Sequence, residues 1–135
     1  MTNDRPAILL LDDEESILNS LKRSLHKVDA KVNAFTSGTQ AIAHIRSQPV
    51  DLIISDMRMP EMDGAEFLYQ SQKIQPNTIR ILLTGYADID SVTKAVNQGK
   101  IHNYLHKPWE HDDLITIIND SLEKVSFAKR KNTIK

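Results

Sequence analysis

The sequence predicts a single α/β domain in which helices cover both faces of one parallel β-sheet. Short segments with strand character alternate about five times with segments whose apolar residues recur at helical spacing. The first strand candidate, residues 7–11, is continuously apolar, which is typical of a strand that is covered on both faces. A length of 135 residues suits one domain with one core.

Two of the expected strands have the character of sheet edges. The second strand alternates polar and apolar residues, so one of its faces is half exposed, and the fifth strand is the weakest. With right-handed crossovers, these edges favour the flavodoxin-like, doubly wound (βα)5 arrangement with strand order 2-1-3-4-5. The strands are expected at residues 7–11, 31–35, 52–56, 79–83 and 101–105.

Each strand is followed by an expected helix, and polar caps mark three of the helix starts. The first helix runs from about 15 to about 27, with apolar residues on one stripe. Ser37, Asp63 and Asp88 are the expected caps of the next three helices. These three helices end before Pro49, before Pro76 and at Gly99, and the last helix runs from about 110 through 125.

The composition excludes several classes of protein and partner. Hydrophobic residues make up 40% and charged residues 26% of the chain, and the net charge is −1, so neither nucleic acid nor an anionic membrane is an expected partner. There is no cysteine, which excludes disulfides and thiolate chemistry. The chain also lacks a signal-peptide core and any apolar run near the roughly 20 residues of a membrane span, so we expect a cytoplasmic protein.

Five chemically active side chains follow the expected strands and should meet at one edge of the sheet, where ligands bind in doubly wound folds. Asp12 and Asp13 follow the first strand, Asp56 ends the third, Thr84 follows the fourth, and Lys107 comes soon after the fifth. Clustered carboxylates repel one another unless a cation neutralises them, and hard oxygen ligands favour Mg²⁺. Lys107 and Thr84 can hold phosphoryl oxygens, so Asp56 is a candidate nucleophile that forms an aspartyl phosphate.

These residues form an ordered set of motifs that resembles a known family. The set resembles the receiver domain of bacterial two-component response regulators over about residues 6–125. The motifs that carry the resemblance are Asp12-Asp13, Asp56-Met57-Arg58-Met59-Pro60 with Met62-Asp63-Gly64, Thr84-Gly85, Tyr104 and Lys107-Pro108.

The resemblance implies a phosphoacceptor, a metal site and a conformational switch. Asp56 would accept a phosphoryl group from a histidine kinase or a phosphotransfer protein. Asp13, Asp56 and the backbone carbonyl of Arg58 would bind Mg²⁺ directly, and Asp12 would act largely through bound water.

Thr84 and Lys107 would hold the phosphoryl oxygens, and Thr84 with Tyr104 would form the switch. The switched surface would comprise the fourth helix, the fifth strand and the last helix, where a homodimer is possible. Residues 1–126 would be the receiver domain, and 127–135 a helix end or a linker toward a possible output domain. The domain would assist its own phosphorylation and dephosphorylation but would not otherwise be an enzyme.

Three alternatives compete with this interpretation. The main one is an interaction module of the same fold that is not phosphorylated, which the intact set of acids, Thr84 and Lys107 argues against. A flavin-binding carrier would need a first loop that cradles phosphate, whereas this loop is acidic. An aspartyl phosphatase would need an Asp-x-Asp pair, whereas Asp12 and Asp13 are adjacent. We interpret the histidines at 102, 106 and 111 as solvated or packing residues, because their spacing is not that of a metal site.

Overall fold

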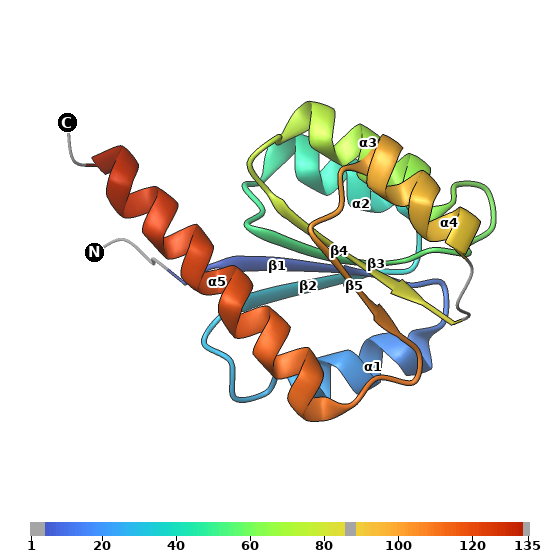
Figure 1. Ribbon diagram of the computed structural model, residues 1–135, viewed down its shortest axis with the longest axis horizontal. Coiled ribbons are helices and arrows are strands. Elements are labelled where there is room, and N and C mark those ends of the chain that lie inside the picture. Colours follow the sequence, from blue (N-terminus) through green and yellow to red (C-terminus); the bar gives the residue numbers. More distant parts are fainter. Residues whose placement is uncertain (1–4, 86–88, 134–135) are drawn as a thin grey trace.

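The protein forms a five-stranded parallel sheet between two layers of helices (Figure 1), in a computed structural model that describes residues 5–85 and 89–133. The strands are β1 (Ala7–Leu11), β2 (Lys31–Phe35), β3 (Leu52–Asp56), β4 (Ile79–Thr84) and β5 (Asn103–His106). The helices are α1 (Glu15–Ser24), α2 (Gly38–Ser47), α3 (Gly64–Ile74), α4 (Ile89–Lys94), which continues as a π-helix over Ala95–Gly99, and α5 (His111–Thr133).

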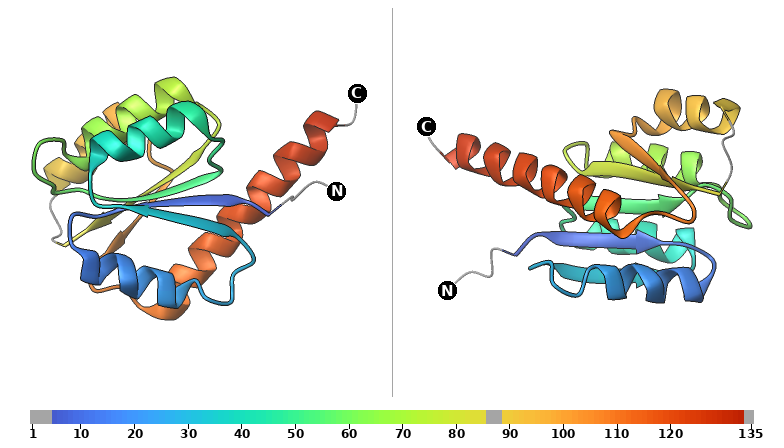
Figure 2. Two further views of the ribbon diagram at one scale, coloured as in Figure 1. Left: turned by 180° about the vertical axis from the view of Figure 1, so that it is seen from behind. Right: turned by 60° about the horizontal axis from the view of Figure 1, so that its bottom comes forward.

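The sheet has the order β2-β1-β3-β4-β5, and its strand pairs are parallel. The predicted doubly wound, flavodoxin-like architecture is therefore confirmed, with β2 and β5 at the two edges. Helices α1 and α5 cover one face of the sheet, and α2, α3 and α4 cover the other (Figures 1 and 2). This arrangement places the carboxyl ends of all strands at one edge, where the loops that lead into the helices begin.

Two apolar clusters, one on each face of the sheet, hold the layers together. Alternate residues of β1 point to opposite faces, so Leu9 packs with α2 and α3, whereas Leu10 packs with α1 and α5. Phe67 of α3 is the largest fully buried side chain on the first face. The central strand β3 is buried along its whole length, and its last residue is Asp56. The buried strand β3 therefore fixes the position of a carboxylate at the end of the sheet.

The sequence identified two helix starts that the structure describes. The Ser37 hydroxyl accepts a hydrogen bond from the Gln40 N–H at 3.3 Å, and the Asp63 carboxylate accepts one from the Glu66 N–H at 2.8 Å. The expected cap at Asp88 lies outside the described residues. Helix α1 ends at Ser24, earlier than expected, because the following turn uses tighter bonds such as the one from His26 N–H to the Arg23 carbonyl.

The segment between α4 and β5 also differs from the expectation. The expected single helix changes to a π-helix at Ala95, and the residue after it, Lys100, has a left-handed backbone with φ of 53°. Strand β5 begins at Asn103, two residues later than predicted. The reason is that the backbone N–H of Arg80 bonds to the ring nitrogen Nδ1 of His102 at 3.0 Å, and the buried Arg80 side chain donates to the Lys100 carbonyl at 3.1 Å.

Helix α5 continues to Thr133, so most of the segment expected as a helix end or linker is helical. Its last turns project beyond the sheet in each view (Figures 1 and 2). None of the helices in the described part of the chain combines the length and the apolar character that crossing a membrane requires.

Candidate functional site

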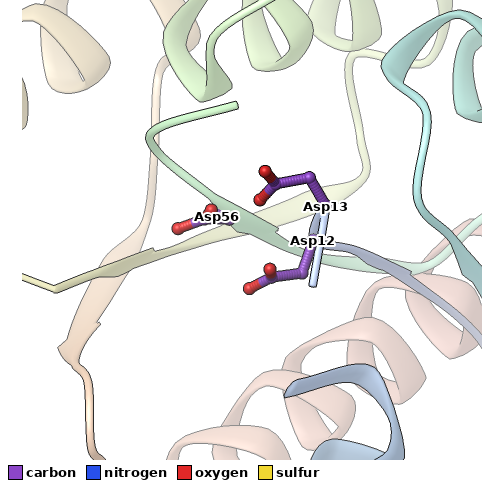
Figure 3. Close-up of side chains that lie close together, drawn as sticks. All are labelled: Asp12, Asp13 and Asp56. Atoms are coloured by element: carbon purple, nitrogen blue, oxygen red, sulfur yellow. The ribbon is translucent and has the colours of Figure 1, made fainter. Parts of the chain in front are cut away.

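Three carboxylates converge where β1 and β3 end side by side. Leu11 pairs with Ser55 in the sheet, so the next residues of the two strands, Asp12 and Asp56, follow at the same level. Asp13 joins them, and one carboxylate oxygen from each residue lies within 4.8 Å of the others. Figure 3 shows the three side chains projecting to the same side of the strand ends. Of the described residues, only these three acids form such a cluster.

The three carboxylates lie in different environments. Asp12 is fully buried and Asp56 is 5% exposed, whereas Asp13 faces solvent. Burial raises the pKa of Asp56 above its usual value, and the negative charge of Asp12 raises it further. The hydrogen bond from Lys107 lowers this pKa but does not outweigh the other two effects. Asp12 also accepts a hydrogen bond from the Glu14 N–H at 2.9 Å, which fixes the carboxylate at the start of α1. The Asp12 carboxylate is thus positioned by the fold itself.

Lys107 links the two buried carboxylates. Its ammonium nitrogen Nζ lies 2.7 Å from Asp12 Oδ2 and 2.9 Å from Asp56 Oδ1. Burial alone would lower the pKa of Lys107, but its hydrogen bonds to both acids outweigh burial and raise that pKa. Lys107 therefore stays charged and offsets part of the repulsion between the acids.

Thr84 occupies the neighbouring strand end. Asp56 pairs with Leu83 of β4, so Thr84 stands one residue further along, and its side chain is buried. The Thr84 carbonyl accepts a hydrogen bond from the Lys107 N–H at 2.8 Å, which ties the backbone of Lys107 to the end of β4. The structure therefore brings Asp12, Asp13, Asp56, Thr84 and Lys107 to one edge of the sheet.

The loop after Asp56 runs close to the start of α3. The Gly64 N–H donates to the Met57 carbonyl at 2.7 Å. A Cβ atom on Gly64 would lie only 2.3 Å from the Asp56 carbonyl oxygen, so this approach requires glycine. Arg58, whose backbone carbonyl is an expected metal ligand, lies in this loop with its side chain exposed.

Tyr104 lies apart from the acid cluster, on the edge strand β5. It pairs with Leu82, two residues before the level of Thr84, and is 43% exposed. Its ring lies edge-on to the ring of His106, with 5.7 Å between the centroids. The Tyr104 ring is thus partly open to solvent in this structure.

The donor set of the cluster fits Mg²⁺. Three carboxylates supply hard oxygen atoms, and the exposed Asp13 leaves room for water, which Mg²⁺ usually retains. Thiolate ligands are absent because the chain has no cysteine. The carboxylates together carry more negative charge than Lys107 can balance, which favours a divalent cation.

Two polar contacts, one near this edge of the sheet and one at the amino end of β4, have no signal in the sequence. Lys94 at the end of α4 pairs with Asp63 at 3.1 Å, and His102 bonds to the backbone of Arg80. Both contacts join residues that are far apart in the chain. In each contact, the two residues meet only because of the path that the folded backbone takes between them.

The chain matches the family described as response regulator receiver domain over residues 8–119. It is 36% identical to the transcriptional regulatory protein GlrR of Escherichia coli (strain K12), over 92% of this chain and 28% of that protein. The chain spans about a quarter of the length of the curated relatives it matches.

Solved structures show the same fold. The signal receiver domain of an HD domain-containing protein from Pseudomonas fluorescens Pf-5 is 38% identical, with a TM-score of 0.87 over 90% of this chain and 98% of that structure. A CheY-like response regulator receiver domain protein from Methanospirillum hungatei JF-1 is 28% identical, with a TM-score of 0.86 over 93% and 99%. Together with the match over most of the sequence, these likenesses establish that the chain belongs to the response regulator receiver domain family.

Proposed function

We propose that Asp56 accepts a phosphoryl group from a phosphohistidine of a sensor histidine kinase or a phosphotransfer protein, in a reaction that depends on Mg²⁺. The observation that carries the proposal is the contact of one ammonium group, that of Lys107, with the carboxylates of both Asp12 and Asp56. This contact places a fixed positive charge beside the nucleophile, where phosphoryl oxygens would arrive.

Three residues would hold the metal directly: Asp13, Asp56 and Arg58, the last through its backbone carbonyl. Asp12 would act through bound water. When bound, Mg²⁺ would offset negative charge on the transferring phosphoryl group. The carboxylate cluster supports this assignment, because its oxygens are close enough to share one cation.

The chain's own residues would position and stabilise the transferring group. An oxygen of the ionised Asp56 carboxylate attacks phosphorus, the P–O bond forms, and the P–N bond of the donor breaks with its electron pair returning to the imidazole nitrogen. Lys107 exchanges its contact with Asp56 for a contact with a phosphoryl oxygen, and the Thr84 hydroxyl donates to another. Burial makes Asp56 more basic and so a better nucleophile, while Lys107 keeps the site attractive to anions.

Phosphorylation would be read out on the surface formed by α4, β5 and α5. Thr84 would move toward the phosphoryl group, and Tyr104 would turn inward from its exposed position, which changes that surface. The altered surface would control a C-terminal output domain or form a homodimer. An output domain is supported by the greater length of the curated relatives, which include transcriptional regulatory proteins.

The experiment is intact-mass measurement after incubation with acetyl phosphate, a small phosphodonor. We expect the wild type to gain one phosphoryl group in Mg²⁺ and none after chelation with EDTA. Asp56→Asn should gain none under either condition, and Lys107→Met should react more slowly. A wild type that gains no mass would overturn the proposal and favour the interaction module that is not phosphorylated.

A further inference from the structure

Helix α4 is short, spans only Ile89–Lys94, and lies near the edge of the sheet that carries the acids (Figure 1). Helix α4 continues directly into the π-helix Ala95–Gly99, and the π-helix packs against α3 (Figure 1). An open cavity of about 500 Å³ lies where α4 faces the loop after β3. It is lined by Met57, Arg58, Met59, Pro60, Asp63 and Lys94. Helix α4 therefore borders open space on the side of the phosphoacceptor.

One ion pair crosses this space. Lys94, the last residue of α4, places its Nζ 3.1 Å from Asp63 Oδ2. The other carboxylate oxygen of Asp63 accepts the Glu66 N–H at 2.8 Å and so caps α3. The ion pair thus connects the end of α4 to the fixed start of α3.

Both partners are continuous in the chain with residues of the phosphoacceptor site. The chain leaves Asp56 and reaches Asp63 through the loop after β3, and it leaves Thr84 and reaches Lys94 through α4. Strands β3 and β4 are neighbours in the sheet, so the two segments start side by side at Asp56 and Thr84. The ion pair joins these segments again at Asp63 and Lys94. It therefore joins the loop that follows Asp56 to the helix that follows Thr84.

We propose that the Asp63–Lys94 ion pair is a latch that holds α4 in the arrangement found before phosphorylation. The latch is closed in a structure in which Asp56 is a carboxylate paired with Lys107. This inference rests on the proposed phosphorylation of Asp56, and it adds a regulatory contact to that site. Opening the latch shifts the domain toward the phosphorylated arrangement.

The strength of the latch follows from its exposure. The side chains of Lys94 and Asp63 are 46% and 36% exposed, and ion pairs of this kind change an equilibrium by about 1.5- to 5-fold. Such a pair sets the balance between two arrangements without preventing the change. Because it is exposed, its effect also decreases at high ionic strength.

The test is titration with beryllofluoride, a mimic of the phosphoryl group, in saturating Mg²⁺. The fluorescence of Trp109, the single tryptophan of the chain, reports binding two residues from Lys107, and calorimetry gives a second measure. The variants are Asp63→Asn, which keeps an oxygen acceptor for the helix cap, Lys94→Gln, and the double variant. Lys73→Gln is the matched control, because it removes an exposed positive charge from α3 outside the latch.

We expect each single variant to lower the half-saturating beryllofluoride concentration by about 1.5- to 5-fold. The double variant should match the single variants, because both remove the same contact. A simple charge effect predicts otherwise: loss of Asp63 would strengthen anion binding and loss of Lys94 would weaken it. Lys73→Gln should bind as the wild type does, and high salt should bring the wild type toward the variants.

Opposite shifts in the two single variants, additive shifts in the double variant, or unchanged affinity in both would overturn the latch. These outcomes leave the proposed function standing if the wild type binds beryllofluoride in a manner that requires Mg²⁺ and Asp56. A wild type without such binding would overturn both proposals.

Discussion

Replacing Gly64 with alanine tests whether the close approach of α3 to β3 positions Asp56. The added Cβ would lie 2.3 Å from the Asp56 carbonyl oxygen and 2.9 Å from the Met57 Cα. Both neighbours are backbone atoms, so no side-chain rotation relieves the overlap, and the two segments must separate by roughly 1 Å to reach van der Waals contact. Overpacking of this kind costs about 1–3 kcal/mol.

Thermal unfolding measures this cost directly. For a domain of this size, each kcal/mol lowers Tm by about 3–5 °C, so Gly64→Ala should lower Tm by roughly 3–15 °C. The displaced Asp56 backbone should also slow phosphorylation by acetyl phosphate. Gly85→Ala is the matched control, since a Cβ there meets no atom within 4 Å among the described residues. If both variants had the Tm of the wild type, the steric reasoning would be refuted.

Three further predictions concern the buried carboxylate, a histidine and the core. Asp56→Asn should raise the stability of the metal-free domain at neutral pH, because the raised pKa of Asp56 means that folding disfavours its ionised form. The variant should also lose the stabilisation that Mg²⁺ gives the wild type. Equal Mg²⁺-dependent shifts in the Tm of variant and wild type would contradict this. Burial, and then the charges of Arg80 and Lys124, lower the pKa of His102, so the unfolded chain takes up a proton first as the pH falls below about 6.5, and stability decreases. Urea unfolding of His102→Gln should therefore show a smaller loss between pH 7.5 and 5.5 than the wild type, and an identical loss would count against the assignment. Phe67→Ala should lower the free energy of unfolding by about 3–5 kcal/mol, whereas Tyr69→Ala, at an exposed position, should lower it far less. Comparable losses for the two variants in denaturant unfolding would refute the central place of Phe67 in the core.

The features that the sequence predicted correctly are those encoded locally. A continuous apolar run identifies β1, alternation identifies the edge strand β2, and the strand order then follows from chain connectivity. The position of Asp12 and Asp56 after neighbouring strands predicted that their carboxylates meet, because parallel strands end at one edge.

The features that the sequence did not predict depend on the path of the backbone between elements. The ring of His102 takes the place of a ladder acceptor for the Arg80 N–H, because the chain turns at the left-handed Lys100 and enters the sheet only at Asn103. A lone histidine carries no local signal of such a contact, so the sequence alone predicts only a solvated or packing residue at this position. The π-helix after α4 likewise has no recognisable composition, and the Asp63–Lys94 pair joins two helices that are separated by β4.

Under the proposed function, the contrast between the acid cluster and α4 would allow one domain both to hold a phosphoryl group precisely and to respond to it. Lys107 reaches Asp12 across 95 residues of sequence, so the site exists only when all of the central strands are in place. Binding at the site therefore stabilises the whole sheet rather than a local segment. Helix α4 continues into a π-helix and is joined to α3 by an exposed ion pair, so under the proposed latch a few contacts to a phosphoryl group would supply the cost of rearranging it. Under these proposals the rigid sheet would fix the chemistry, and helix α4 beside it would be where phosphorylation changes the surface.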